Sequence, residues 1–119
     1  MRLYYKFDEA PVYFDSTHGL TDTVRLSCRG ENISAITCDF PKGFTWVPHS
    51  HVHEQLTVVL SGRIDYTVDG ETFRMGPGDT LYVPSNAMHH AAALTECRCM
   101  DVFTPVRADQ MAWFDDPTE

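Results

Sequence analysis

The chain of 119 residues is long enough for one domain, and its hydrophobic fraction of 43%, which includes 7 Phe, 5 Tyr and 2 Trp, is enough to build one core. Lys and Arg number 9 against 17 Asp and Glu, and the resulting net charge of −8 has the wrong sign for binding nucleic acid or an anionic membrane surface. No apolar run approaches the roughly 20 residues of a membrane-spanning helix, so we expect neither nucleic acid nor membrane as a partner.

Short strands separated by turns are predicted along most of the chain. Turn signals such as Arg29-Gly30 and Asp69-Gly70 recur about every ten residues, and Val, Ile, Thr, Tyr and Phe are frequent between them. A small antiparallel protein must close on itself to protect its edges, so the sequence predicts an all-β barrel or jelly roll, a single domain over residues 1–119. In chain order we expect strands at 24–29, 33–40 and 55–60, a hairpin over 63–75 that turns at Asp69-Gly70, strands at 80–83, 89–94 and 97–103, and at most one short C-terminal helix near 108–114.

Three histidines, His49, His51 and His53, lie two residues apart. On an extended backbone residues i and i+2 share a face, so His49 and His51 can direct two imidazoles at one point, as a metal chelate requires. His53 has the same parity, and we expect a local twist to turn it away from that point. An HxH pattern by itself also fits a solvated polar loop, so its interpretation depends on the sequence around it.

The surrounding spacing resembles the cupin superfamily. Residues 43–62 resemble the first cupin motif, with Gln55 in the place usually held by Glu, and residues 78–93 resemble the second motif, with Asn86 in place of the usual Gly and Ala93 in place of a terminal Asn. This resemblance implies a cupin jelly-roll β-barrel. It also implies one divalent metal ion, of Ni²⁺, Zn²⁺, Fe²⁺ or Mn²⁺ type, held by His49, His51, Gln55 and His89.

The exchange of Glu for Gln55 changes the charge of the implied metal site. Four neutral ligands leave the double positive charge of the ion uncompensated, which favours an anionic substrate group. The same exchange removes the carboxylate that iron oxygenases combine with two histidines, which makes an oxygenase less favoured.

A narrower resemblance is to the small single-domain cupins of the KdgF type, which act in pectin degradation. It rests on residues 51–55, 77–79 and 100–107. The resemblance implies an isomerase of uronate metabolism that converts cyclic 4,5-unsaturated uronate monosaccharides, released from pectin or alginate, to linear 5-keto-4-deoxyuronate. It implies acid/base catalysis by Asp101, substrate contacts from Phe103 and Arg107, with Arg107 also polarising the substrate anion, and a second, catalytic role for Gln55.

The residues themselves allow two interpretations of Asp101. Asp101 shares a parity with Cys97, Cys99 and Phe103, so an inward Phe103 requires an inward Asp101, whose burial should raise its pKa. The alternative is a carboxylate at the barrel rim that forms a salt bridge with Arg98 or Arg107.

Two other candidates for substrate binding also have open interpretations. The Arg107 guanidinium can bind a uronate carboxylate with two parallel hydrogen bonds, or it can be a surface charge that follows Pro105. Trp46 either lines the barrel mouth and stacks on a sugar or packs at the edge of the core.

Two further functional hypotheses and an oligomeric state complete the expectations. The same site suits a small cupin cyclase, isomerase or dioxygenase of secondary metabolism that acts on an aromatic or keto-acid substrate, and it also suits a non-catalytic module that binds a small acid or sugar. The first residues lack a secretory signal, and the four cysteines have no CxxC spacing, so we expect a cytoplasmic protein with reduced thiols. Small cupins commonly pair, and residues 3–7 form an apolar strand candidate that could cross to a second copy in a homodimer.

Overall fold

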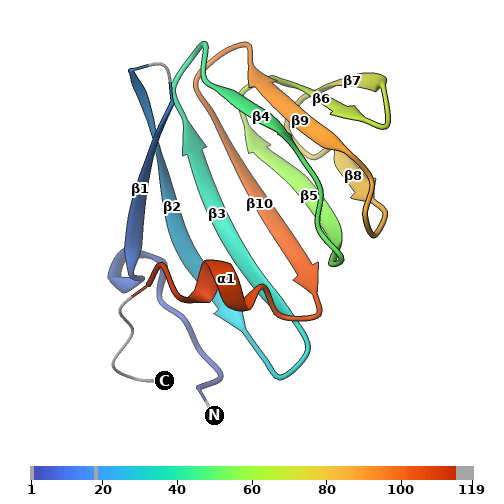
Figure 1. Cartoon of the computed structure of the whole chain (residues 1–119). Coiled ribbons are helices and arrows are strands. Elements are labelled where there is room, and N and C mark those ends of the chain that lie inside the picture. The colour runs from blue at the N-terminus through green and yellow to red at the C-terminus, as the bar shows by residue number, and fades with distance from the viewer. Residues whose placement is uncertain (1, 18, 115–119) are drawn as a thin grey trace.

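The computed structural model describes residues 2–17 and 19–114, which form two antiparallel sheets (Figure 1). The larger sheet has six strands in the order β1-β2-β3-β10-β5-β8, and the smaller has four in the order β4-β9-β6-β7. The elements are a 3-10 turn η1 (Phe7–Glu9), β1 (Val12–Thr17), β2 (Leu20–Arg29), β3 (Ser34–Phe40), β4 (Thr45–His49), β5 (Glu54–Ser61), β6 (Ile64–Val68), β7 (Glu71–Met75), β8 (Thr80–Val83), β9 (His89–Ala93), β10 (Cys97–Thr104) and α1 (Ala108–Met111).

The core lies between the two sheets because side chains alternate along each strand. On β2 the inward positions Val24 and Leu26 are buried, whereas the residues between them are only partly covered. On β10 the inward face carries Cys97, Cys99 and Phe103, all buried. The predicted all-β jelly roll is confirmed, and the four cysteines are free thiols, as expected.

The C-terminal segment crosses the inner face of the larger sheet. Figure 1 shows α1 in front of the lower ends of β2 and β3. The Arg107 backbone N–H, just before α1, donates to Ser34 Oγ at the start of β3 over 3.0 Å. After the helix, the ring of Trp113 stacks on Tyr13 of β1, with centroids 4.8 Å apart. The segment therefore closes one end of the space between the sheets.

Most of the predicted elements are confirmed, and the clearest is the β6–β7 hairpin. Its turn residues Asp69 and Gly70 have φ of 47° and 84°, and positive φ at both central positions is what a type I′ turn requires. The helix is shorter than predicted and ends at Met111. Two strands, β1 and β4, are missing from the sequence prediction. In β1 the apolar Val12 and Phe14 face solvent, which inverts the usual pattern of an amphipathic strand.

The predicted N-terminal strand is wrong. Residues 3–6 have no regular structure, and η1 begins at Phe7. The guanidinium groups of Arg25 and Arg98 each lie 4.8 Å from the Phe7 ring centroid, so Phe7 packs on its own chain through cation–π contacts, while Leu3 and Tyr4 are exposed. No helix within residues 2–17 and 19–114 is both long and apolar enough to cross a membrane.

Candidate active site

A cavity of about 140 Å³ opens between the two sheets and is closed on one side by the C-terminal segment. Both sheets contribute to its wall, which places strands far apart in the sequence around one space. Apolar groups form most of the wall, and its polar and aromatic side chains are Phe40, Trp46, His49, Gln55, Tyr66, Asp101, Phe103, Arg107, Gln110 and Trp113.

Three histidines meet beside this cavity. His49 ends β4 and pairs in register with His89, which begins β9, while His51 lies in the connection between β4 and β5. One ligand nitrogen from each of the three lies within 4.8 Å of the others. The structure therefore brings together the three predicted histidine ligands.

Backbone carbonyls fix the orientation of all three imidazoles. Each Nδ1 lies 2.8 or 2.9 Å from a carbonyl oxygen, those of Val47 for His49, His53 for His51 and Ala87 for His89. A carbonyl only accepts, so each Nδ1 carries the proton and each Nε2 keeps a free lone pair. Burial is the largest cause that lowers the pKa of each imidazole, to about 4 for His89, so the ring stays neutral and able to bind a metal.

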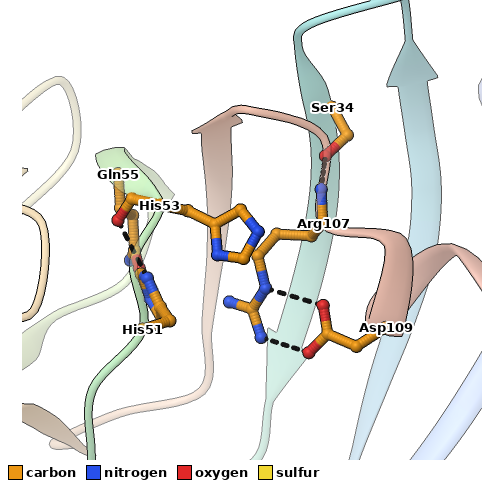
Figure 2. Close-up of polar contacts among 6 residues, drawn as sticks. All are labelled: Ser34, His51, His53, Gln55, Arg107 and Asp109. Carbon is orange, nitrogen blue, oxygen red and sulfur yellow. Dashed lines mark hydrogen bonds and ion pairs between the residues drawn. The ribbon is translucent and has the colours of Figure 1, made fainter.

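Three acceptor atoms at this cluster fit a bound cation. His89 Nε2 is buried and has no hydrogen-bond partner among the described residues. His51 Nε2 lies 3.1 Å from Gln55 Oε1, and with the proton on Nδ1 both of these atoms are acceptors (Figure 2). A divalent ion bound to the lone pairs of His89 Nε2, His51 Nε2 and Gln55 Oε1 would satisfy all three atoms. The residues present thus fit a metal site of three imidazoles and one amide oxygen.

Hydrogen bonds hold the Gln55 amide in the orientation this site needs. Gln55 Nε2 donates to Thr57 Oγ1 over 2.8 Å and to Tyr66 Oη over 3.0 Å, which directs Oε1 toward His51. Thr57 Oγ1 in turn donates to Asp101 Oδ1 over 2.7 Å. The chain Gln55–Thr57–Asp101 therefore links the metal side of the cavity to its only inward carboxylate within the described wall.

Asp101 faces the cavity, as its parity on β10 predicts. It pairs in register with Thr57 of β5, and burial raises its pKa to about 6 against the opposing effects of the Thr57 hydrogen bond and the Arg107 charge. The rim salt bridge is wrong, because Arg98 and Arg107 pair instead with Asp39 and Asp109 at 2.6 and 2.7 Å. A carboxyl with this pKa populates both protonation states near neutral pH.

Arg107 lies at the cavity wall but is not free. Its Nε and Nη2 atoms donate to the two carboxylate oxygens of Asp109 over 3.0 and 2.7 Å, so its plane is fixed (Figure 2). Its guanidinium carbon lies 4.9 Å from the centroid of Phe103, which is buried and also meets the His51 ring edge-on at 5.6 Å. Arg107 and Phe103 thus form one stacked unit beside the histidines.

The remaining predicted residues, His53 and Trp46, are also placed. His53 is outside the three-histidine cluster, as expected, and Figure 2 shows its ring beside the Arg107 side chain. Trp46 of β4 combines both interpretations, because it packs edge-on against Phe40 in the core and also lines the cavity, 5.9 Å from the His49 ring.

Several side chains of the site are missing from the sequence prediction. Thr57 is two residues after Gln55, so the parity argument applied to Asp101 would have found it. Asp109, Gln110 and Trp113 belong to the C-terminal segment, whose path across the sheet no periodicity indicates.

Comparison with known proteins agrees with this architecture. Residues 36–103, more than half of the chain, match the family described as the cupin domain. The pectin degradation protein KdgF of Dickeya dadantii (strain 3937) is 29% identical over 113 residues, which cover 92% of this chain and 98% of that protein. The structure of KdgF from a Halomonas species has a TM-score of 0.83 at 27% identity and covers 92% of this chain and 99% of that one. An RmlC-like cupin from Shewanella frigidimarina NCIMB 400 has a TM-score of 0.82 at 25% identity over 92% and 96% of the two chains. The chain belongs to the cupin family, and within it is a small cupin that resembles KdgF.

Proposed function

We propose that the protein is a metal-dependent cupin enzyme that converts cyclic 4,5-unsaturated uronate monosaccharides, from pectin or alginate breakdown, to linear 5-keto-4-deoxyuronate. The observation that carries the proposal is Asp101, a cavity carboxyl with a pKa raised to about 6, set beside three inward imidazoles. The resemblance to a pectin degradation protein over most of both chains supports the substrate class.

The reaction is an isomerisation whose protons Asp101 moves. The ring opens as the bond between C1 and the ring oxygen breaks and the anomeric hydroxyl loses its proton, which leaves an aldehyde at C1. The enolate that this leaves at C5 becomes a ketone when C4 gains a proton, so atoms balance without water or an oxidant. Asp101 accepts a proton in one half and returns one in the other, since its pKa lies near the working pH.

The other cavity residues bind and orient the substrate. The fixed Arg107 fork, with donors not used by Asp109, receives the uronate carboxylate, and Trp46 and Phe103 contact the sugar. His49, His51, His89 and Gln55 would hold one divalent ion of Ni, Zn, Fe or Mn type, which supplies positive charge that polarises substrate oxygens. The Gln55–Thr57–Asp101 chain keeps the carboxyl aligned with that site.

Ultraviolet absorbance tests this proposal, because the conjugated enol ether of the substrate absorbs and the product does not. Metal-loaded protein should speed the loss of absorbance of unsaturated galacturonate in a saturable way, and proton NMR should identify the linear ketone. A rate equal to the spontaneous one, measured with protein that contains metal, would contradict the proposal.

The proposed enzyme acts in the cytoplasm and as a homodimer, both of which rest on the sequence. Phe7 contacts Arg25 and Arg98 of its own chain, whereas the side chains of Leu3 and Tyr4 are exposed and can contact a second copy. Light scattering that gives a mass near 13.5 kDa at micromolar concentration would contradict the dimer.

A further inference from the structure

One wall of the cavity is built by the C-terminal segment alone. Arg107, Gln110 and Trp113 are spaced three residues apart and all line the cavity. Two of them are held from outside, Arg107 by the Asp109 carboxylate and Trp113 by its stack on Tyr13. This wall contributes none of the proposed metal ligands, and Gln110 is its polar side chain with an unpartnered atom.

Gln110 is the unusual member of this wall. Its side chain is 5% exposed, and its Oε1 is buried with no hydrogen-bond partner in the described part of the chain. A buried amide end without a partner destabilises a fold, and an apolar residue of similar length would fill the same space. The position therefore has a polar group that the folded chain does not itself use.

The neighbours of Gln110 indicate what that partner is. Arg107 offers a planar cationic fork that suits a carboxylate, and Trp113 and Trp46 offer aromatic rings that suit the C–H face of a pyranose. The Gln110 amide, placed among these groups, would contact a hydroxyl of the pyranose that they bind. Because a hydroxyl both donates and accepts, it satisfies either end of the amide.

We propose that the Gln110 side chain binds a ring hydroxyl of the substrate, and that this bond makes the cavity select hydroxylated sugar acids over aromatic or keto acids that lack a hydroxyl there. The inference rests on the proposed function for the kind of acid that is bound. It adds a residue that determines specificity, on a segment that contributes none of the proposed metal ligands. A site built around a hydroxyl rejects an analogue without one, because its buried amide is then left unpaired.

Binding to galacturonate, a saturated sugar acid that does not react, tests the inference without catalysis. Calorimetric titration of metal-loaded protein should show galacturonate binding that Gln110→Leu weakens about tenfold, since a neutral hydrogen bond is lost. Galacturonate analogues that lack the 2- or the 3-hydroxyl complete a double-mutant cycle. For one of them the wild-type protein and Gln110→Leu should bind within about twofold of each other.

Thermal unfolding separates a binding role from a structural one. If Gln110 serves the ligand, the melting temperature of Gln110→Leu should equal or exceed that of the wild type, because an unpartnered polar atom is removed. A lower melting temperature together with equal losses for every analogue would mean a structural role and would overturn the inference. Gln110→Met, which is longer and apolar, replaces the first variant if it does not fold.

The outcomes also separate this inference from the proposed function. Binding of galacturonate that depends on Gln110, without ring opening of unsaturated galacturonate, supports the inference and rejects the proposed reaction. Ring opening with the same KM in wild type and Gln110→Leu supports the reaction and overturns the inference. Undetectable binding of galacturonate by the wild-type protein overturns the inference as well.

Discussion

Among the described residues, Asp101 and Asp22 are two carboxyl groups that point into the barrel. Asp101 lies on β10 in the middle of the larger sheet, and Asp22 lies on β2, next to the edge strand β1. Burial is the first cause that raises both pKa values, to about 6 and about 7. Asp101 accepts a hydrogen bond from Thr57 and lines the cavity, whereas both Asp22 oxygens are buried without a hydrogen-bond partner in the described residues, and Asp15 on β1 adds repulsion. A raised pKa alone therefore does not identify a reactive carboxyl in this protein. What distinguishes Asp101 from Asp22 is that Asp101 lines the cavity.

The two regions also differ in what surrounds the carboxyl. Asp101 is tied through Thr57 and Gln55 to the histidine cluster, and Arg107 lies near enough to oppose the rise of its pKa. Asp22 is fully buried, and the charged group that acts on it is Asp15 on the neighbouring strand β1, which raises its pKa further. In the proposed mechanism the same physical effect serves proton transfer at Asp101, whereas at Asp22 burial of the carboxyl only destabilises the fold.

The distinction between the cavity around Asp101 and the region around Asp22 would fail most completely if the cavity catalysed the reaction without its proposed metal ligands. His89→Ala removes a buried imidazole whose Nε2 has no protein partner, so most bound metal and all turnover above the spontaneous rate should be lost. The fold should remain, because the core between the sheets is apolar. Elemental analysis and circular dichroism measure the two effects.

A neighbouring histidine provides the control for that experiment. His90 follows on β9 with the opposite parity and is absent from the cluster, so His90→Ala should keep both metal and activity. Full metal content in His89→Ala would contradict the ligand assignment.

A smaller effect is expected at Arg107, which we propose binds the substrate carboxylate and transfers no proton. Arg107→Ala should raise KM about tenfold and change kcat much less, since the carboxylate is present in ground and transition states alike. Asp109→Asn keeps the guanidinium and loosens its orientation, so it should raise KM less. Steady-state kinetics decide the point, and a fall in kcat with unchanged KM would assign Arg107 to the chemical step.

The smallest effect concerns stability and belongs to Asp22. Its folded pKa of about 7 lies above the ordinary value of 3.8, so the fold favours the protonated form and loses stability as pH rises between these values. Asp22→Asn is neutral throughout and should raise the free energy of unfolding by about 1 kcal/mol or more at about pH 8, with no gain at about pH 4. Urea unfolding at both pH values measures it, and an equal gain at the two would show that ionisation is not the cause.

The sequence predicted the half of the site that regular strands position. Alternation on β10 placed Asp101 beside Phe103, because period-two geometry is fixed by the pleat and needs no tertiary information. The meeting of His49, His51 and His89 came from the resemblance to the cupin motifs, since His51 lies between two strands and His89 lies on another strand. The pairing of Arg107 with Asp109 was not predicted, because it depends on a turn after β10 that has no periodic pattern.

The fold likewise contains parts that the local sequence predicts and parts that depend on tertiary contacts. The β6–β7 hairpin follows from Asp69-Gly70, whose backbone conformations the turn requires. Residues 3–7 have the composition of a strand, but Phe7 begins a 3-10 turn and forms cation–π contacts with Arg25 and Arg98 instead. The alternation of residues along the sequence predicts which side chains share a face of a strand, but it does not predict which other strand will pair with it.

The most direct test of the account is to compare Asp101→Asn with Asp22→Asn on unsaturated galacturonate, both loaded with metal to the wild-type level. Asp101→Asn keeps size and hydrogen bonding but cannot transfer the proton, so kcat should fall by about 10²-fold or more with KM little changed. Asp22→Asn should turn over within about twofold of the wild type, because Asp22 does not line the cavity. Near-normal turnover by metal-loaded Asp101→Asn would contradict the account.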